Sequence, residues 1–451
     1  MHMKQMKDYA YHYALKGKMK GSFEQQHEAN KMIGCANFVH NRLVALNNEL
    51  HMLRKVGVYL APVARRIEYI ESVLDSAKTL KNSAPFLSEV NDDIVQNEIA
   101  NYRQAWKNFF AGRANIPTFH SKRNGGSCQV NTRYDSGKSG ILESRGVRFI
   151  DKKHMILPGI GRVKVLFSPK LIDALFSRTA ETRMGTVTIE RDAAGEYWVS
   201  VLFGSDEPFV KPYEKTDKAI GIDLNLSNFL TDSNGEAVDN PSPLKKAEEK
   251  LAREQRKLSR RRVAAEKKNI SLSEAMNYQE QRVVVAKLHR NIARQREDFH
   301  NRVAKRSVEN QDVVILEDLR VKNLLGNHNL AKAISDVGWR SFITICEQKA
   351  SMRGHLVITV SPNYTTQTCS ECGTVSDKKI LLGVEAWTCS HCGAVHGRDH
   401  NSAKNVLDKG IKHIAEDPMR YATTVKAPLL ADLHSLCDSI LSESAVSGKR
   451  V

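Results

Sequence analysis

Residues 366–405 have the sequence TQTCSECGTVSDKKILLGVEAWTCSHCGAVHGRDHNSAKN, and this stretch decides how the rest of the chain is interpreted. It contains two CxxC pairs with about sixteen residues between them, a spacing typical of a zinc site. Gly373 and Gly393 follow the two pairs and permit a tight turn under a metal. A redox dithiol would need only one pair, so we predict one structural Zn²⁺ held by four thiolates. The predicted zinc ligands are Cys369, Cys372, Cys389 and Cys392.

Composition limits the class of protein further. The chain has 451 residues, enough for several modules, and a net charge of +17, which favours a polyanionic partner such as nucleic acid. No apolar run approaches the roughly twenty residues that a membrane span needs, and the N-terminus lacks an apolar signal core. The four remaining cysteines are scattered, as in a reduced cytosolic protein. We therefore expect a cytoplasmic protein that binds nucleic acid and no membrane; in a prokaryote it would be associated with the nucleoid.

The N-terminal half changes from strand-like to helix-like patterns and back. Residues 8–20 alternate like a strand, residues 24–110 have helical periodicity, and residues 115–211 are strand-like again. A hairpin is expected to turn at residues 193–195. We expect the strands before and after the helices to form one barrel. Bases and aromatics suited to a nucleic-acid groove interleave at Phe119, Lys122, Arg123, Tyr134 and Arg148.

Three helices are expected within residues 24–110. The second covers residues 61–80, and the third begins after Ser88 and Glu89. The first carries apolar residues at helical spacing, which we assign to a bundle core. These residues are Phe38, Leu43, Leu46, Leu50 and Leu53.

Three acids stand out in the C-terminal half. Asp223 lies within the apolar strand predicted over residues 219–225, where a carboxylate is costly unless it is paired or binds a metal. Glu317 lies near the end of a second apolar strand over residues 312–319. Asp399 begins a helix seven residues after the last cysteine; such an acid is more often a cap than a catalyst. Their occurrence in one segment favours a shared Mg²⁺ site, because Mg²⁺ prefers carboxylate oxygens.

Several neighbours of these acids have alternative interpretations. Asp318 competes with Glu317, but strand alternation directs the two side chains to opposite faces. Arg398 could contact the scissile phosphate or only neutralise the acids, and we favour the phosphate contact. His396 and His400 are expected to be solvated, because four thiolates already complete the zinc shell.

Residues 243–306 form a basic segment with helical character and a break near residues 269–273. The segment has about nineteen Lys and Arg against about eight Asp and Glu. A solvated helical hairpin is the ordinary interpretation. A net charge of about eleven on one element is better explained by a path lined with phosphates.

The segments GIDLN, LEDL, YTTQTCSECG, WTCSHCG and GRDHNSAKN resemble the RuvC-type nuclease and zinc ribbon of the transposon-encoded TnpB family. The resemblance covers about residues 216–408, and the family is similar to the miniature type V CRISPR effectors. It implies an RNA-guided DNA endonuclease in which Asp223, Glu317 and Asp399 are the catalytic acids. These acids would hold two Mg²⁺ ions and hydrolyse phosphodiester bonds without a covalent intermediate.

The resemblance also implies the partners of the chain. They are a guide RNA from the transposon end and double-stranded target DNA, beside which the protein reads a short motif. Two positions depart from the family pattern: Asn225 replaces a common Gly, and Gly397 replaces a common Asp. Neither is one of the three acids, so we expect activity to survive.

The expected fold class is α/β multidomain: an RNase H-like (RuvC) nuclease domain with an inserted zinc ribbon, preceded by a β-barrel wedge domain that a helical recognition lobe interrupts. We expect a monomer. The expected boundaries are wedge 1–23 and 115–215, recognition lobe 24–114, nuclease 216–365 and 396–415 with the basic insert 243–306, zinc ribbon 366–395, and an accessory tail 416–451.

Four other functions compete with this one. A guided repressor would bind DNA without cutting, but loss of an acid would be its signature and all three are present. A compact type V CRISPR effector would share the same motifs. A zinc-ribbon transcription regulator would leave the acid-bearing strands unexplained, and a transposase that joins DNA ends would not match the family resemblance.

Overall fold

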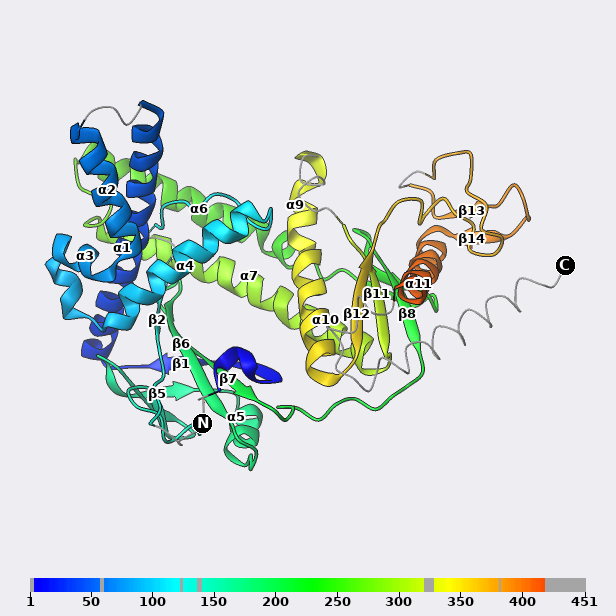
Figure 1. Ribbon diagram of the computed structural model, residues 1–451. Coiled ribbons are helices and arrows are strands. Elements are labelled where there is room, and N and C mark those ends of the chain that lie inside the picture. The colour runs from blue at the N-terminus through cyan, green and yellow to red at the C-terminus, as the bar shows by residue number, and fades with distance from the viewer. Residues whose placement is uncertain are drawn as a thin grey trace. The chain divides into compact units, whose positions relative to one another are not determined.

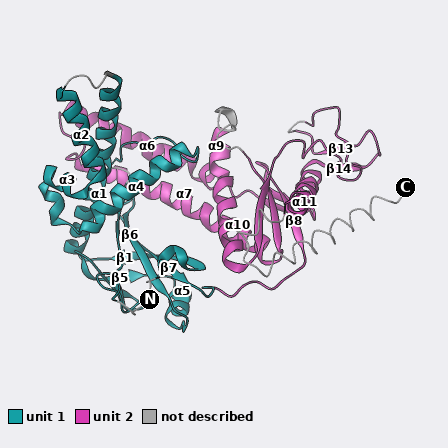
Figure 2. Ribbon diagram, viewed as in Figure 1, with its two compact units in different colours: residues 1–209 teal, residues 210–451 magenta. Residues whose placement is uncertain are grey.

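The computed structural model describes residues 4–56, 61–121, 125–135, 140–319, 328–380 and 383–417. The chain divides into two compact units, Met1–Phe209 and Val210–Val451 (Figure 2). Lys122 and Arg123 of the predicted groove, and the predicted tail from residue 418 onward, lie outside the described residues. No helix within the described ranges is long and apolar enough to cross a membrane.

The first unit contains a seven-stranded sheet (Figure 1). The N-terminal strand β1 pairs antiparallel with β7 and β5, so the strand before the helices does join those after them, as the sequence predicted. Strands β6 and β7 form the predicted hairpin, in which Arg191 pairs with Tyr197. The order runs from β2 to β3, and closure of this sheet into a barrel stays a prediction. In sheet order the strands are β2 (Gly126–Val130), β6 (Arg183–Arg191), β7 (Tyr197–Ser205), β1 (Tyr11–Lys20), β5 (Gly161–Leu166), β4 (His154–Leu157) and β3 (Arg148–Asp151).

The helices of the first unit follow the predicted pattern with two differences. Leu43 and Leu46 are fully buried, as the apolar stripe predicts, but Phe38 is 38% exposed and packs edge-on against Phe86 instead. The predicted second helix is interrupted at Ser76, whose hydroxyl accepts the backbone N–H of Thr79 and caps a new helix. The helical elements are η1 (Met6–Asp8), α1 (Phe23–Val56), α2 (Ala61–Asp75), α3 (Ala77–Ser83), η2 (Pro85–Glu89), α4 (Asp92–Phe110) and α5 (Pro169–Phe176).

The second unit is built on a mixed five-stranded sheet. Strands β10, β9 and β8 pair antiparallel, whereas β8, β11 and β12 pair parallel. The three parallel strands are the apolar strands that the sequence predicted; β8 and β11 are buried on both faces, whereas burial alternates along the edge strand β12. In sheet order the strands are β10 (Ala237–Asp239), β9 (Asn228–Asp232), β8 (Ala219–Leu224), β11 (Val313–Glu317) and β12 (Leu356–Val360).

Two hydrophobic cores cover the faces of this sheet. On one face Ile222 and Leu316 pack with Ala304 of α7 (Met276–Glu309) and Phe342 of α10 (Trp339–Arg353). On the other face Ile315 belongs to a core with residues of α11 (Arg398–Glu416), which lies along this side of the sheet (Figure 1). The sheet is therefore the middle layer of an α/β sandwich.

The basic segment forms a helical pair, as predicted. Helix α6 (Pro243–Lys267) and α7 are separated by a break that includes residues 269–273, and they share a small core of Leu251, Val285 and Ile292. A short helix, α9 (His328–Val337), precedes α10. Between β12 and α11, the cysteine-rich stretch contributes the two-stranded sheet β13 (Ala386–Thr388) and β14 (Val395–Gly397).

Candidate active site and metal centre

The sheet register places the first two predicted acids side by side. Leu316 of β11 pairs with Ile222 of β8, so Glu317 and Asp223 occupy the next positions along neighbouring parallel strands. Ile222 and Leu316 point into the α7 and α10 core, and alternation sends Asp223 and Glu317 to the face that α11 covers. Both acids are buried, with 5% and 4% of their surfaces exposed.

Helix α11 brings the third acid to the same place. Asp399 lies in its first turn. The helix can approach β8 closely because Gly221 has no side chain: a Cβ there would lie 2.5 Å from the backbone nitrogen of Leu407 and closer still to the carbonyl oxygen of Ala403. Close packing of α11 on β8 therefore accounts for the glycine of the GIDLN motif. The same packing places Asp399, in the first turn of α11, on the side of the sheet where Asp223 lies.

Hydrogen bonds tie the carboxylates to their surroundings. The Thr365 hydroxyl donates to Oε1 of Glu317 at 2.7 Å. The side-chain amide of Asn225 donates to Oδ2 of Asp399 at 3.2 Å and lies 3.5 Å from Oδ2 of Asp223. Asn225 therefore bridges Asp223 and Asp399, whereas Glu317 is held by Thr365 and is close enough to Asp223 to feel its charge.

The electrostatics of this group favour a bound cation. Burial raises the pKa of the Asp223 carboxyl, and the nearby charge of Asp399 adds to the rise. Burial and the charge of Asp223 likewise raise the pKa of Glu317. The fully buried Ser402 lies beside both carboxyls and offsets part of each rise. Because these groups resist ionisation by themselves and offer oxygen ligands, the residues fit the Mg²⁺ that the sequence predicted.

Four neighbours can now be compared with their predictions. Asp318 is exposed whereas Glu317 is buried; because β11 ends at Glu317, Asp318 lies just beyond the strand. The Arg398 guanidinium forms an ion pair with Asp399, with its Nε 3.1 Å from Oδ1, so in this conformation it neutralises an acid. The expectation of solvated histidines is wrong for His396, which is 7% exposed; His400 is half-buried, and its Nε2 lies 3.2 Å from the Ser233 carbonyl oxygen.

Sequence reasoning missed Thr365, Ser402 and the contact made by Asn225. Thr365 and Ser402 both lie inside quoted motifs, and Ser402 follows Asp399 by three positions on one helix face. That spacing was a usable signal. The contact between Asn225 and Asp399 joins residues 174 positions apart, and local sequence offers no sign of it.

The four predicted cysteines converge on a second centre. Their sulfur atoms all lie within 4.8 Å of one another. The Cys369–Cys392 and Cys372–Cys389 sulfur pairs are both 3.7 Å apart. Four sulfurs at about 2.3 Å from a tetrahedral Zn²⁺ would be roughly 3.8 Å apart. The donor set and its size therefore fit one zinc ion.

His396 is buried because it packs against this cysteine centre. Its Nε2 lies 3.0 Å from the sulfur of Cys369, so it can donate a hydrogen bond to a thiolate. Its ring also packs against Trp387, with the ring centres 5.0 Å apart. A donor held in this way stabilises and orients a zinc-bound thiolate.

A second group with metal-ligand chemistry lies in the first unit and fits a metal poorly. His40, Glu98 and His120 offer ligand atoms close together. However, the two imidazoles stack face to face at 3.6 Å with planes 5° apart, so their in-plane lone pairs cannot converge on one ion. Both nitrogens of His40 already face acceptors, the Glu98 carboxylate and the Thr118 carbonyl.

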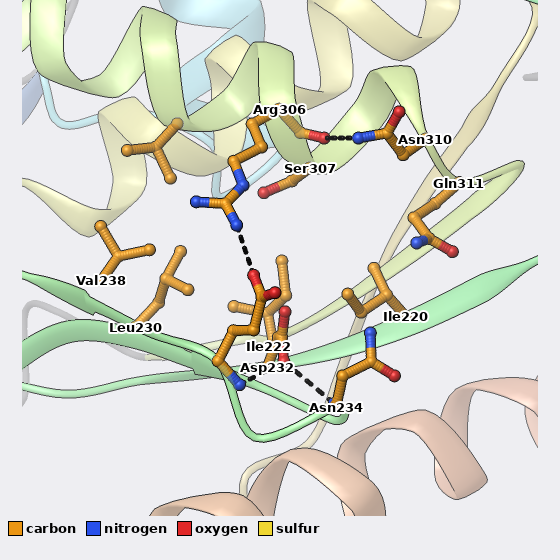
Figure 3. Close-up of a pocket in the computed structure, with 12 residues that line it drawn as sticks. Ile220, Ile222, Leu230, Asp232, Asn234, Val238, Arg306, Ser307, Asn310 and Gln311 are labelled. Atoms are coloured by element: carbon orange, nitrogen blue, oxygen red, sulfur yellow. Dashed lines mark hydrogen bonds and ion pairs between the residues drawn. The ribbon is translucent and has the colours of Figure 1, made fainter.

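A pocket of about 200 Å³ lies on the opposite face of the five-stranded sheet (Figure 3). Ile220 and Ile222 of β8 line one side, and Arg306 of α7 reaches down to form an ion pair with Glu236. Since Asp223 points to the α11 face, this pocket is separate from the carboxylate centre. The ion pair ties α7 to the turn between β9 and β10.

We compared the chain with protein families and with individual known proteins. The family described as "Probable transposase" matches residues 189–328, and the family described as "Cas12f1-like, TNB domain" matches residues 339–406. A putative RNA-guided DNA endonuclease of Streptomyces pristinaespiralis is 30% identical, over 86% of this chain and 87% of its own length. The putative RNA-guided DNA endonuclease InsQ of Escherichia coli (strain K12) is 24% identical, over 88% of this chain and 92% of its own.

Among solved structures, the cryo-EM structure of the Cas12f1–sgRNA–target DNA complex is similar, with a TM-score of 0.45 and 14% identity, covering 85% of this chain and 82% of that one. The fold and the site define an α/β protein with a buried carboxylate group beside a four-cysteine centre. Its similarity to the Streptomyces protein over most of both lengths shows its family: the chain belongs to the TnpB family of transposon-encoded RNA-guided DNA endonucleases.

Proposed function

We propose that this protein is an RNA-guided DNA endonuclease of a transposable element, and that it hydrolyses target DNA at Asp223, Glu317 and Asp399. One observation carries the proposal: three acids from two strands and a helix meet beneath α11, two of them buried and with raised pKa values. A structural role would not need several carboxyls where burial opposes their charge. The Streptomyces and Escherichia relatives, which match most of this chain, are both named as putative RNA-guided DNA endonucleases.

In this proposal the side chains of the protein bind the metal ions and orient the scissile phosphate. Asp223, Glu317 and Asp399 would hold two Mg²⁺ ions, which would supply the positive charge needed to activate a water and to stabilise the leaving 3′ oxygen. Thr365 fixes one oxygen of Glu317, leaving the other free to bind. Arg398 is placed to exchange its ion pair with Asp399 for a contact to the scissile phosphate.

We further propose the finer architecture that the family resemblance implies. The five-stranded sheet with α11 would be an RNase H-like RuvC domain, and the cysteine-rich stretch a zinc ribbon inserted between β12 and α11. The seven-stranded sheet would be the wedge domain, and α1 to α4 the recognition lobe. The boundaries predicted from sequence stay part of this proposal, as do a monomeric state and association with the nucleoid.

The proposed partners are a guide RNA from the transposon end and double-stranded target DNA. The net charge of +17 and the basic pair α6 and α7 support binding to a long polyanion. We expect the protein to co-purify with an RNA of roughly a hundred nucleotides or more, a length that would occupy this many basic groups. Its affinity should fall by about a thousandfold between 50 and 200 mM salt if six or more phosphates are neutralised.

The test is to purify the protein from its host context, sequence the bound RNA, and assay cleavage with Mg²⁺ before and after the RNA is removed. A redesigned guide should restore cleavage and move it to the new complementary site. Cleavage of arbitrary duplex DNA by stripped protein, or failure of a new guide to redirect it, would exclude RNA guidance. Binding to the guided site without cleavage would favour the repressor function.

A further inference from the structure

Asn225 is the first residue after β8, and its side chain is almost fully enclosed, with 8% of the residue exposed. A buried amide must satisfy both of its polar ends, because an unpaired buried donor or acceptor is destabilising. The partners of its two ends therefore define which way the amide points.

The carbonyl end of this amide is held by the turn that follows. Oδ1 of Asn225 accepts the backbone N–H of Asn228 at 2.8 Å and the hydroxyl of Ser227 at 3.3 Å. Because the backbone N–H of Asn228 can only donate, the oxygen must face the turn and the NH₂ group must face the other way. Local structure thus fixes the orientation of the side chain.

The NH₂ group faces two of the acids. It lies 3.2 Å from Oδ2 of Asp399 and 3.5 Å from Oδ2 of Asp223, between an acid of β8 and an acid of α11. Arg398 binds the other oxygen of Asp399, so that carboxylate is held from both sides. The amide carries no charge, and it orients these carboxylates without cancelling the negative charge that a cation needs.

We propose that Asn225 is a positioning residue for the divalent-cation site, setting the spacing of Asp223 and Asp399 before the ion enters. The inference rests on the proposed function, since it assigns a role at the same site. Carboxylates that are already spaced lose less freedom on binding an ion, which raises affinity. Removing a residue that orients metal ligands typically lowers metal affinity by about ten to a hundredfold.

The experiment adds increasing Mg²⁺ to the metal-free full chain and records the unfolding temperature at each concentration. The half-saturating Mg²⁺ concentration, which is the apparent Kd, is obtained from the dependence of the unfolding temperature on Mg²⁺. Asn225→Ala should raise this concentration about tenfold. Asn225→Asp should lower it below the wild-type value, because an additional carboxylate in the same place becomes a ligand. Asn37→Ala is the matched control: Asn37 is a similarly buried asparagine, 6% exposed, in α1 of the first unit.

A residue that only supports the fold would lower the unfolding temperature equally with and without Mg²⁺, as expected for the Asn37 control. An unchanged half-saturating concentration in Asn225→Ala, or shifts in the same direction for Ala and Asp, would overturn the inference. Asp223→Ala separates this result from the proposed function. If that variant still shows the wild-type response to Mg²⁺, the cation site itself is misplaced; if it loses the response while Asn225→Ala keeps it, only the role of Asn225 fails.

Discussion

Replacing Gly221 by alanine tests whether the packing of α11 on β8 places the third acid. A Cβ at this position would lie 2.5 Å from the Leu407 backbone nitrogen, whereas ordinary non-bonded contacts begin at about 3.5 Å. The shortfall is about 1 Å, and the opposing atoms are helix backbone, which cannot rotate away. Helix α11 must therefore shift by about this distance or the strand must distort.

The expected cost follows from that shift. Overpacking in a core typically destabilises by about 1–3 kcal/mol, and the loss of chain freedom on replacing Gly offsets about 0.4–1 kcal/mol of this. A net loss of about 1.3 kcal/mol would speed amide exchange in β8 and α11 about tenfold when exchange follows local opening. A displacement of about 1 Å at Asp399 would slow DNA cleavage by about a hundredfold.

Two other glycines give the matched controls. At Gly410 the atoms nearest to a Cβ belong to the side chain of Ile315 rather than to backbone, so Gly410→Ala should destabilise less than Gly221→Ala. At Gly34, within α1, a Cβ would meet nothing within 4 Å, so Gly34→Ala should stabilise its unit by about 0.5–1 kcal/mol. Hydrogen exchange measured by mass spectrometry, with single-turnover cleavage, gives both quantities. If Gly221→Ala exchanges and cuts like the wild type, close packing does not position Asp399.

The remaining predictions concern the acids, the zinc centre and a buried histidine. Glu317→Gln should slow cleavage at least about a thousandfold while retaining RNA, and should raise the metal-free unfolding temperature, because burial disfavours the charge of Glu317; unchanged cleavage would contradict its role. Cys369→Ser should release one Zn²⁺ per chain by metal analysis, and His396→Ala should weaken zinc binding about tenfold in a chelator competition; a wild-type zinc content after Cys369→Ser would exclude the site. Burial lowers the pKa of His300 to about 4, so its neutral form contributes stability that is complete above pH 6.5 and is lost as the pH falls toward 4. His300→Gln should flatten the decline of the unfolding temperature across that window, and an unaltered decline would show that other groups cause it.

The sequence predicted best those features that local pattern determines. The parallel strands β8, β11 and β12 were recognisable as short β-branched runs, and Asp223 and Glu317 could be assigned to the first two of these strands. The cysteine spacing likewise predicted the four-sulfur group, because two knuckles bring four thiolates together whatever surrounds them. In both cases the local residue pattern that identifies the strand or the metal centre is also what causes it to form.

Features that depend on a distant partner could not be predicted. The helical face containing Phe38 is periodic, but Phe38 lies at its margin and packs against Phe86, almost fifty residues away. His396 looked solvated because nothing in its neighbourhood shows that the chain returns it to Cys369. Asn225 looked like a tolerated departure from the family until its contact with Asp399 was visible.

The zinc centre and the carboxylate centre are also joined by hydrogen bonds from α11. Asn401 accepts the backbone N–H of Ser370 at 2.9 Å, beside the first zinc cysteine. Asn405 donates to the carbonyl of Thr365 at 2.8 Å, and the hydroxyl of the same Thr365 holds Glu317. One face of the helix that begins with Asp399 is therefore bound to the first knuckle and to the residue that orients another acid. In the proposed mechanism, loss of zinc should loosen Asp399 and Glu317 together, and the zinc centre would then support catalysis by fixing the position of α11 rather than by any chemistry of its own.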